Sequence, residues 1–198
     1  MADDALECAL GSQIDSMDED RMMVAAARSD REAAGRLFEK YYSKILGYIY
    51  HCTFNSDVAE DLTSNVFLAA FRHLKRYQWR QISFGAWLFR IATNEVRMHW
   101  RRQKRIGMVS LQPDDEHCGE HSVGNSIEAN EEYRLLYKAL LELRLKYRTV
   151  IILRYFEGKT IAEICELTAT KEGTVKSQLH RGLARLQDIL VRWGVLAE

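Results

Sequence analysis

The stretch TIAEICELTATKEGTVKSQLHRGLARLQDIL, residues 160–190, decides how the C-terminal part of the chain folds. Its apolar residues recur every three or four positions from Thr160 to Leu167 and again from about residue 171 to residue 190, which predicts a short helix and then a longer one. Only residues 168–170 separate the two helices. Two helices joined by so short a turn, with the second helix richer in cations, are typical of a helix-turn-helix motif.

The longer helix is predicted to have two different faces. One face is an apolar stripe that can pack on Ile161, Ile164 and Leu167, and it consists of Val175, Leu179, Leu183 and Leu186. The other face carries the polar residues Lys176, Ser177, His180 and Arg181, with Arg185 further along. The first turns of a recognition helix contact base edges in the major groove, and a later cation suits a phosphate. The alternative is a solvated basic face on an ordinary three-helix domain.

The rest of the chain also has helical periodicity and no strand signal. We expect helices at about 18–29, 31–53, 56–76, 84–105, 128–144 and 147–156, with an N-cap from residues 55–57 and a stop at Gly158. Residues 77–83 lack periodicity, which predicts a loop that exposes Trp79 and Arg80. The sequence therefore predicts an all-α fold of two small helical domains, residues 18–105 and 128–192. They are joined by a flexible linker, residues 106–127, which holds the only proline, Pro113.

Charge is balanced over the whole chain, with 28 cations and 28 anions, but it is segregated along it. Residues 71–105 carry ten cations and one anion, and residues 106–132 carry seven anions and no cation. Residues 133–198 carry twelve cations and seven anions, so two basic bodies flank an acidic linker. We hypothesise that the linker shields these basic bodies in the free protein.

The helix predicted at 84–105 combines cations with aromatic residues. Four of its residues recur at helical spacing and share a face: Arg90, Asn94, Arg97 and Arg101. Trp79 in the preceding loop, with Trp87 and Trp100, offers rings on which unstacked bases can stack. Cations interleaved with aromatic rings are typical of single-stranded nucleic-acid binding. The alternative for Trp87 and Trp100 is burial in the core.

Asp57, Glu60 and Asp61 share one face at the start of the helix predicted at 56–76. A metal-dependent nuclease would need further oxygen ligands from other elements, and no second carboxylate cluster occurs in this domain. Docking onto a basic protein partner fits this cluster better. Simple charge compensation at a helix N-terminus is the third possibility.

The four cysteines are widely spaced and form no CxxC pair, which favours reduced thiols. His117, Cys118 and His121 could hold a metal ion, but no fourth ligand lies nearby and a polar linker is the simpler interpretation. The acidic N-terminus is unlike a signal peptide, and no apolar run is long enough to span a membrane. We expect a cytoplasmic protein without membrane insertion, metal or other cofactor.

Three motifs in order along the chain resemble those of a known family. They are DVAEDLTSNVFLAAFRHL (residues 57–74), WLFRIATNEVRMHWRRQKR (87–105) and EGTVKSQLHRGLARL (172–186). Together they resemble the extracytoplasmic-function (ECF) sigma factors of the sigma-70 family over about residues 20–190. The resemblance implies an alternative sigma factor that takes core RNA polymerase to promoters, reads the −35 element and opens the −10 element. From the charge segregation we also hypothesise that the acidic linker follows a nucleic-acid path through polymerase when the protein is bound to it.

The resemblance assigns roles to particular positions. The residues implied to bind core polymerase are Asp57, Glu60, Asp61, Leu62 and Asn65; those for −10 DNA are Trp79, Arg80, Gln81, Ser83, Trp87, Arg90, Asn94, Arg97 and Arg101; those for −35 DNA are Thr174, Lys176, Ser177, His180, Arg181 and Arg185. The chain departs from the family pattern at Ser64 and Asn65, where the family has Gln followed by an acid. Ala169 replaces the turn glycine and Lys171 the capping serine, so we expect a tighter turn or a cap from Thr170.

The implied partners are bacterial core RNA polymerase, promoter DNA and an anti-sigma factor, with the free chain a monomer and no catalytic residue. A helix-turn-helix regulator that acts without polymerase is the main alternative, and it would normally bind palindromic DNA as a dimer. A recombinase or nuclease is the second alternative, for which the sequence offers no convincing nucleophile.

Overall fold

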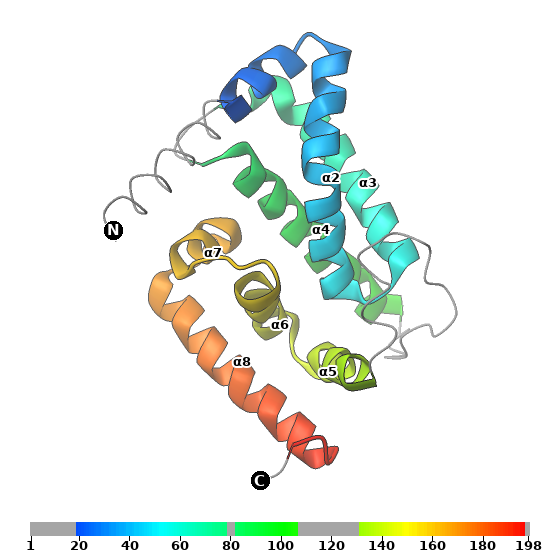
Figure 1. Ribbon diagram of the computed structural model, residues 1–198, viewed down its shortest axis with the longest axis vertical. Helices are drawn as coiled ribbons and strands as arrows, with labels where there is room; N and C mark the ends of the chain where they lie inside the picture. Colours follow the sequence, from blue (N-terminus) through cyan, green and yellow to red (C-terminus); the bar gives the residue numbers. More distant parts are fainter. Residues whose placement is uncertain (1–18, 79–81, 107–130, 197–198) are drawn as a thin grey trace, which may run out of the picture.

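The computed structural model describes residues 19–78, 82–106 and 131–196, and every regular element in these ranges is helical (Figure 1). The N-terminal unit, residues 19–106, contains a helix at 19–27, α2 (Arg31–Thr53), α3 (Ser56–His73), the 3-10 turn η1 (Leu74–Arg76) and α4 (Phe84–Ile106). The C-terminal unit, residues 131–196, contains α5 (Glu131–Glu142), α6 (Leu145–Ile151), the π-helical turn η2 (Ile152–Phe156), α7 (Ile161–Thr168) and α8 (Glu172–Arg192). The predicted all-α fold with a helix-turn-helix in its second unit is confirmed.

Polar side chains at the helix starts explain why the boundaries agree with the sequence pattern. The Asp30 carboxylate accepts a hydrogen bond from the backbone N–H of Glu32, 2.9 Å away, at the start of α2. The Asn55 side chain does the same for the backbone N–H of Val58, at 2.8 Å, at the start of α3. Each side chain pairs a helix N–H that has no carbonyl partner within its own helix.

The helix-turn-helix differs in detail from the sequence expectation. Ala169 adopts the left-handed conformation, with φ of 52°, so alanine takes the backbone geometry for which glycine is usual. The expected cap from Thr170 is wrong, because its hydroxyl donates to the Thr168 carbonyl oxygen instead, 3.1 Å away. Lys171 occupies the N-cap position of α8 without a side-chain cap.

The apolar stripe of α8 also needs one correction. Leu183 is exposed, and the buried position is Gly182. An α-helix turns by about 100° per residue, so successive steps of four residues drift away from the stripe that starts at Val175, while a step of three returns to it. Gly182 packs tightly: a Cβ added to it would lie 3.0 Å from Cδ1 of Ile151.

The two units pack directly against each other. Figure 1 shows the end of α2 and the length of α4 facing the helices of the C-terminal unit, with α7 beside α4. The ring of Phe54, just after α2, lies 3.9 Å from the ring of Tyr137 in α5, centroid to centroid. The buried side chains of both units form one continuous hydrophobic cluster. The sequence predicted two bodies on a flexible linker and gave no sign of this contact.

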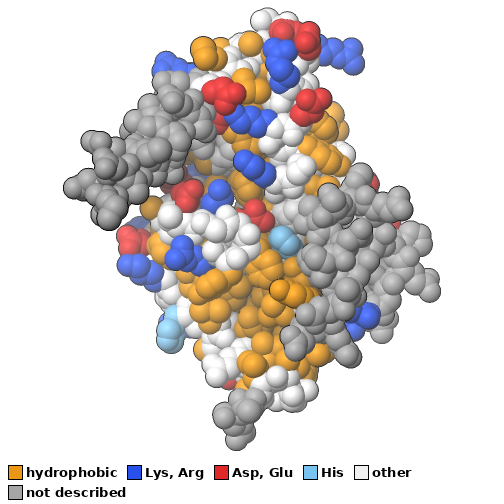
Figure 2. Space-filling view, in the orientation of Figure 1, with side chains coloured by type: hydrophobic (Ala, Val, Ile, Leu, Met, Phe, Trp, Pro, Cys, Tyr) orange, Lys and Arg blue, Asp and Glu red, His pale blue; other side chains and the backbone are white. Residues whose placement is uncertain are grey.

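The surface has mixed charge. Figure 2 shows acidic and basic side chains intermingled over the upper part of one face, with hydrophobic side chains gathered below them. None of the helices in the described ranges combines the length and the apolar character needed for a membrane crossing.

Candidate functional site

The candidate recognition face of α8 is accessible. Thr174, Lys176, His180 and Arg181 are exposed and Ser177 is half-buried. The Lys176 ammonium lies 2.6 Å from the Glu172 carboxylate, and this hydrogen-bonded ion pair raises the pKa of Lys176. Both partners are exposed, so the pair adds little stability and leaves the ammonium able to exchange its partner for a phosphate or a base. The α8 face therefore presents donors on a rigid element.

Arg185 lies further along α8 and is held differently. Its guanidinium lies over the ring of Tyr147 in α6, 5.2 Å from the ring centroid. This cation–π contact orients the side chain along the flank of the helix. A cation positioned there suits a phosphate beside the groove better than a base edge.

The candidate DNA face of α4 is only partly free. Asn94 and Arg101 are exposed, whereas Arg90 and Arg97 are half-buried. The Arg90 guanidinium donates to the backbone carbonyl oxygen of Glu166 in α7, 3.0 Å away. The packed arrangement of the two units thus occupies one of the four residues predicted to share this face.

The remaining predicted residues around α4 divide into three groups. Ser83 caps α4, since its hydroxyl accepts a hydrogen bond from the backbone N–H of Ala86 at 3.2 Å. Trp87 packs on Tyr77 and Phe84, so one face of its ring belongs to the core. Trp79, Arg80 and Gln81 lie outside the described residues, as do His117, Cys118 and His121.

The acidic surface of α3 is exposed, with one exception. Asp57, Glu60, Asp61 and Asn65 are exposed as expected. Leu62 is 5 % exposed and lies outside this exposed surface, because one residue after Asp61 the helix has turned by about 100° into the core.

Leu68 belongs to the same acidic surface and was not predicted. It lies seven positions after Asp61, two turns along the same side of α3, and it is 55 % exposed. An exposed leucine beside carboxylates gives the surface an apolar anchor as well as charge. The spacing from Asp61 was the available signal.

Polar and aromatic contacts hold the two units together. The His51 ring lies parallel to the Tyr137 ring, and its Nδ1 is 3.4 Å from the Glu157 carboxylate. The Arg148 guanidinium donates to the backbone carbonyl oxygen of Cys52 at 3.2 Å. It also lies 4.6 Å from the centroid of the Trp100 ring. Arg148 is 3 % exposed, and burial lowers its pKa to about 10, so it stays protonated at neutral pH.

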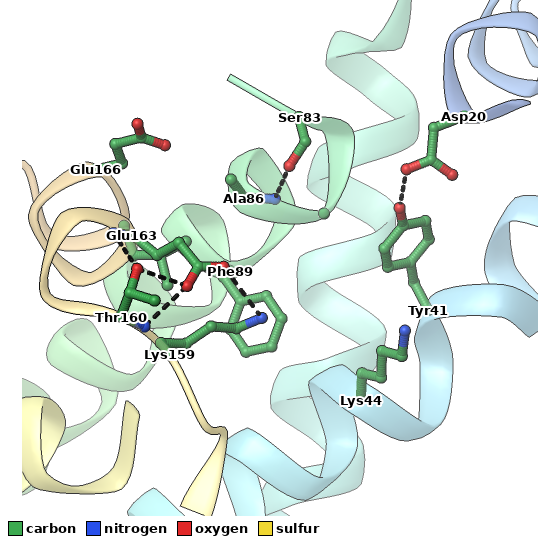
Figure 3. A pocket seen from close by; sticks show the side chains of 12 residues that line it. Asp20, Tyr41, Lys44, Ser83, Ala86, Phe89, Lys159, Thr160, Glu163 and Glu166 are labelled. Carbon is green, nitrogen blue, oxygen red and sulfur yellow. Dashed lines mark hydrogen bonds and ion pairs between the residues drawn. The ribbon is translucent and has the colours of Figure 1, made fainter. Parts of the chain in front are cut away.

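A groove of about 550 Å³ runs between the units on the side of α7. Figure 3 shows Lys159, Thr160 and Glu163 on one side of it, and Asp20 and Tyr41 on the other. The Lys159 ammonium lies 5.4 Å from the centroid of the Phe89 ring across this boundary.

Two local networks shape the walls of this groove. Partial burial raises the pKa of Glu163, but hydrogen bonds from the backbone and hydroxyl of Thr160 outweigh it and keep the pKa low. The Tyr41 hydroxyl donates to Asp20, and burial together with this bond raises the pKa of Tyr41. Nowhere in the described ranges do three His, Cys, Asp or Glu side chains come together as a metal site.

Comparison with known proteins shows which family the chain resembles. The model for sigma-70 region 2 matches residues 37–106, and the model for sigma-70 region 4 matches residues 133–186. The chain is 29 % identical over 177 residues to the ECF RNA polymerase sigma factor BldN of Streptomyces coelicolor, covering 87 % of this chain and 67 % of the relative. It is 33 % identical over 159 residues to the ECF RNA polymerase sigma factor SigE of Mycolicibacterium smegmatis, covering 79 % of this chain and 61 % of the relative.

A solved structure has the same fold. The sigma factor RpoE of Bartonella quintana, in complex with the anti-sigma factor NepR, superposes with a TM-score of 0.60 at 22 % identity, covering 79 % of this chain and 95 % of that one. Family models match on both sides of the linker, and curated relatives match across it. This chain therefore belongs to the ECF group of the sigma-70 family of RNA polymerase sigma factors.

Proposed function

We propose that this chain is an alternative sigma factor, which directs core RNA polymerase to specific promoters and starts transcription by −35 recognition and −10 strand opening. The observation that carries the proposal is the placement of two different basic helices, α4 and α8, in separate units of one chain, with an acidic surface on α3. A chain with two unlike DNA-facing helices reads two unlike elements as a monomer. A dimeric regulator would instead present the same helix twice.

We assign polymerase binding, −35 recognition and −10 binding to separate surfaces of the chain. Residues 18–105 would bind core polymerase through Asp57, Glu60, Asp61 and Asn65, with Leu68 as an apolar addition. Residues 128–192 would read the −35 duplex through α8, and residues 106–127 would connect the two. The −10 strand would lie on the α4 face together with the loop at 77–83. The work is binding and strand opening, and we expect no bond to be made or broken by the protein.

The packed arrangement of the units suits the free protein better than the promoter-bound one. Arg90 is engaged by Glu166, and α4 lies against α7. Two promoter elements separated by one or more duplex turns lie at least about 34 Å apart, so we expect the units to separate when both helices bind DNA together. Docking of the α3 surface on polymerase would supply the free energy for this separation. It would also link two weak DNA contacts through effective concentration.

Restraint by an anti-sigma factor is the second partnership we propose. The Bartonella neighbour is described in complex with one, and in this chain the groove between the units offers a place where such a protein could hold both units at once. The proposed partners, core polymerase and promoter DNA, lie in the bacterial cytoplasm, where we expect the chain to act.

The test is co-migration with bacterial core RNA polymerase on a sizing column. We expect the wild type to co-migrate and Asp61→Lys to elute alone. Glu39→Lys makes the same charge change at an exposed position of α2 and should co-migrate like the wild type. A wild type that elutes alone as a dimer, and shifts DNA without polymerase, would replace this proposal by the regulator.

A further inference from the structure

A second groove between the units has a strongly positive lining. It is about 660 Å³ in volume and lies where the C-terminal half of α4 meets the turn between α5 and α6. Five of its lining residues are cations: Arg97, Arg101, Arg144, Lys146 and Arg148. Among the described residues that line the groove, Glu142 is the single carboxylate, and it is already paired with Arg192 at 2.6 Å. The groove therefore carries an excess of positive charge that its own walls do not balance.

The deepest cation of this groove has an incomplete set of partners. In the described part of the chain, Nε of Arg148 and the indole Nε1 of Trp100 have no hydrogen-bond partner. Buried donors are rarely left without an acceptor, and a buried cation without a counter-ion is unfavourable. A negatively charged occupant of the groove would relieve this imbalance through the field of its charge.

We propose that the groove binds the acidic segment of this same chain, residues 114–120, in the free protein. This segment contains Asp114, Asp115, Glu116 and Glu120 and no cation. It belongs to residues 107–130, which lie outside the described residues, so its place is inferred from charge and reach. Guanidinium groups match carboxylates with paired hydrogen bonds, which makes the arginine-rich lining a suitable receptor.

The chain leaves the described structure close to this groove. Arg101 is five residues before the end of α4 at Ile106, which is about 7.5 Å along the helix axis. Asp114 is eight residues beyond Ile106 and can reach up to about 28 Å from it. A segment tethered so closely acts at an effective concentration of about millimolar, so a weak site is sufficient.

Occupation would have a functional consequence. The lining comes from α4 on one side and from α5 and α6 on the other, so the segment would stabilise the packed arrangement of the two units. It would also neutralise Arg97 and Arg101, which belong to the candidate DNA face. The inference concerns the free chain and does not depend on the proposed promoter recognition.

The test uses a spin label on Cys118, within the segment, and the NMR signals of the tryptophan indoles. Cys8 and Cys165 are replaced by alanine. Cys52 can remain, because burial raises the pKa of its thiol to about 12 and makes it unreactive. We expect the label to broaden the Trp100 indole signal. Trp87, about 20 Å away along α4, should keep its intensity. The Trp100 signal should return in about 1 M salt, where the Debye length falls to about 3 Å.

Charge variants then decide between occupants. Neutralising the segment (D114N, D115N, E116Q, E120Q) and neutralising the groove (R144Q, K146Q) should each restore the Trp100 signal, while R21Q with R31Q, two exposed cations elsewhere, should not. Helical circular dichroism confirms that each variant folds. The proposal fails if Trp100 is not broadened, or if the groove variant stays broadened. It also fails if added pyrophosphate shifts Trp100 equally in the wild type and the segment variant, since the groove would then be open to free anions.

Discussion

Removal of the Arg148 side chain should loosen the contact between the two units. Its guanidinium lies on Trp100, a contact worth about 0.5–2 kcal/mol. It also donates to the Cys52 carbonyl oxygen, a charged hydrogen bond worth about 1.5–3 kcal/mol. That oxygen belongs to the last turn of α2, where carbonyls have no partner within the helix.

The burial of an unbalanced cation opposes both contributions, so we expect Arg148→Ala to weaken the packed arrangement by about 1–3 kcal/mol. This corresponds to about a 5- to 150-fold change in the ratio of packed to separated units. In a chain whose Cys8, Cys118 and Cys165 are replaced by alanine, energy transfer between dyes on Ser43→Cys in α2 and Ala184→Cys in α8, both exposed positions, would report the change as a loss of efficiency. Arg154→Ala is the control, because its guanidinium donates to Lys159 within the C-terminal unit.

The reasoning is refuted if Arg148→Ala leaves the transfer efficiency as high as Arg154→Ala does. An Arg148→Met variant separates the two contributions. Methionine keeps an apolar contact with Trp100 and removes both the buried charge and the hydrogen bond. If Met restores the efficiency that Ala loses, packing on the indole holds the units together; if it does not, the bond to α2 does.

Three further predictions concern the folding of the units. Gly182→Val should lower the free energy of unfolding by about 1–3 kcal/mol, because its Cβ would meet packed side chains at 3.0–3.2 Å. Gly173 has open space around it, so Gly173→Val should lower the free energy of unfolding by less. Thermal melting compares the two variants. Ala169→Gly should raise the free energy of unfolding by up to about 1 kcal/mol, because glycine adopts the left-handed backbone without strain. Ala162→Gly inside α7 should instead lower it by about 0.5–1 kcal/mol. Denaturant titrations that give equal effects for the two variants would show that the Ala169 backbone is not strained. Burial raises the pKa of Tyr77 to about 12 from its usual 10.0, so its contribution to stability is complete below pH 10 and is lost as the pH rises through 12. Tyr77→Phe should therefore lose less unfolding free energy than the wild type between pH 10 and pH 12. Equal slopes of unfolding free energy against pH in this range would contradict the prediction.

The helices could be predicted from the sequence because apolar periodicity and N-cap residues lie within, or directly beside, each helix. The start of α3 depends on Asn55, which belongs to the cap predicted at residues 55–57, and the start of α2 depends on Asp30 in the same way. The mistake at Leu183 is an error of helical phase, because one residue turns a side chain by about 100°, and the burial of Leu62 next to the exposed Asp61 has the same cause. The left-handed backbone of Ala169 has no such local signal, because alanine rarely adopts a positive φ.

The contact between the units could not be predicted at all. Phe54 and Tyr137, or Cys52 and Arg148, are far apart in the sequence and carry no periodic signal that pairs them. The candidate site was predicted as a set of helix faces, and most of those faces are exposed as expected. The structure adds that Arg90 and Arg97 on α4 are half-buried, which connects DNA binding to the separation of the units.

The most direct test of this account measures the distance between the units when core RNA polymerase is added. In the chain labelled at Ser43→Cys and Ala184→Cys, we predict high energy transfer in the free protein and a marked fall on addition of core polymerase. The same chain with Asp61→Lys should keep its high transfer. Unchanged transfer in a wild-type chain that co-migrates with polymerase would contradict the account, because the units would then bind polymerase without separating.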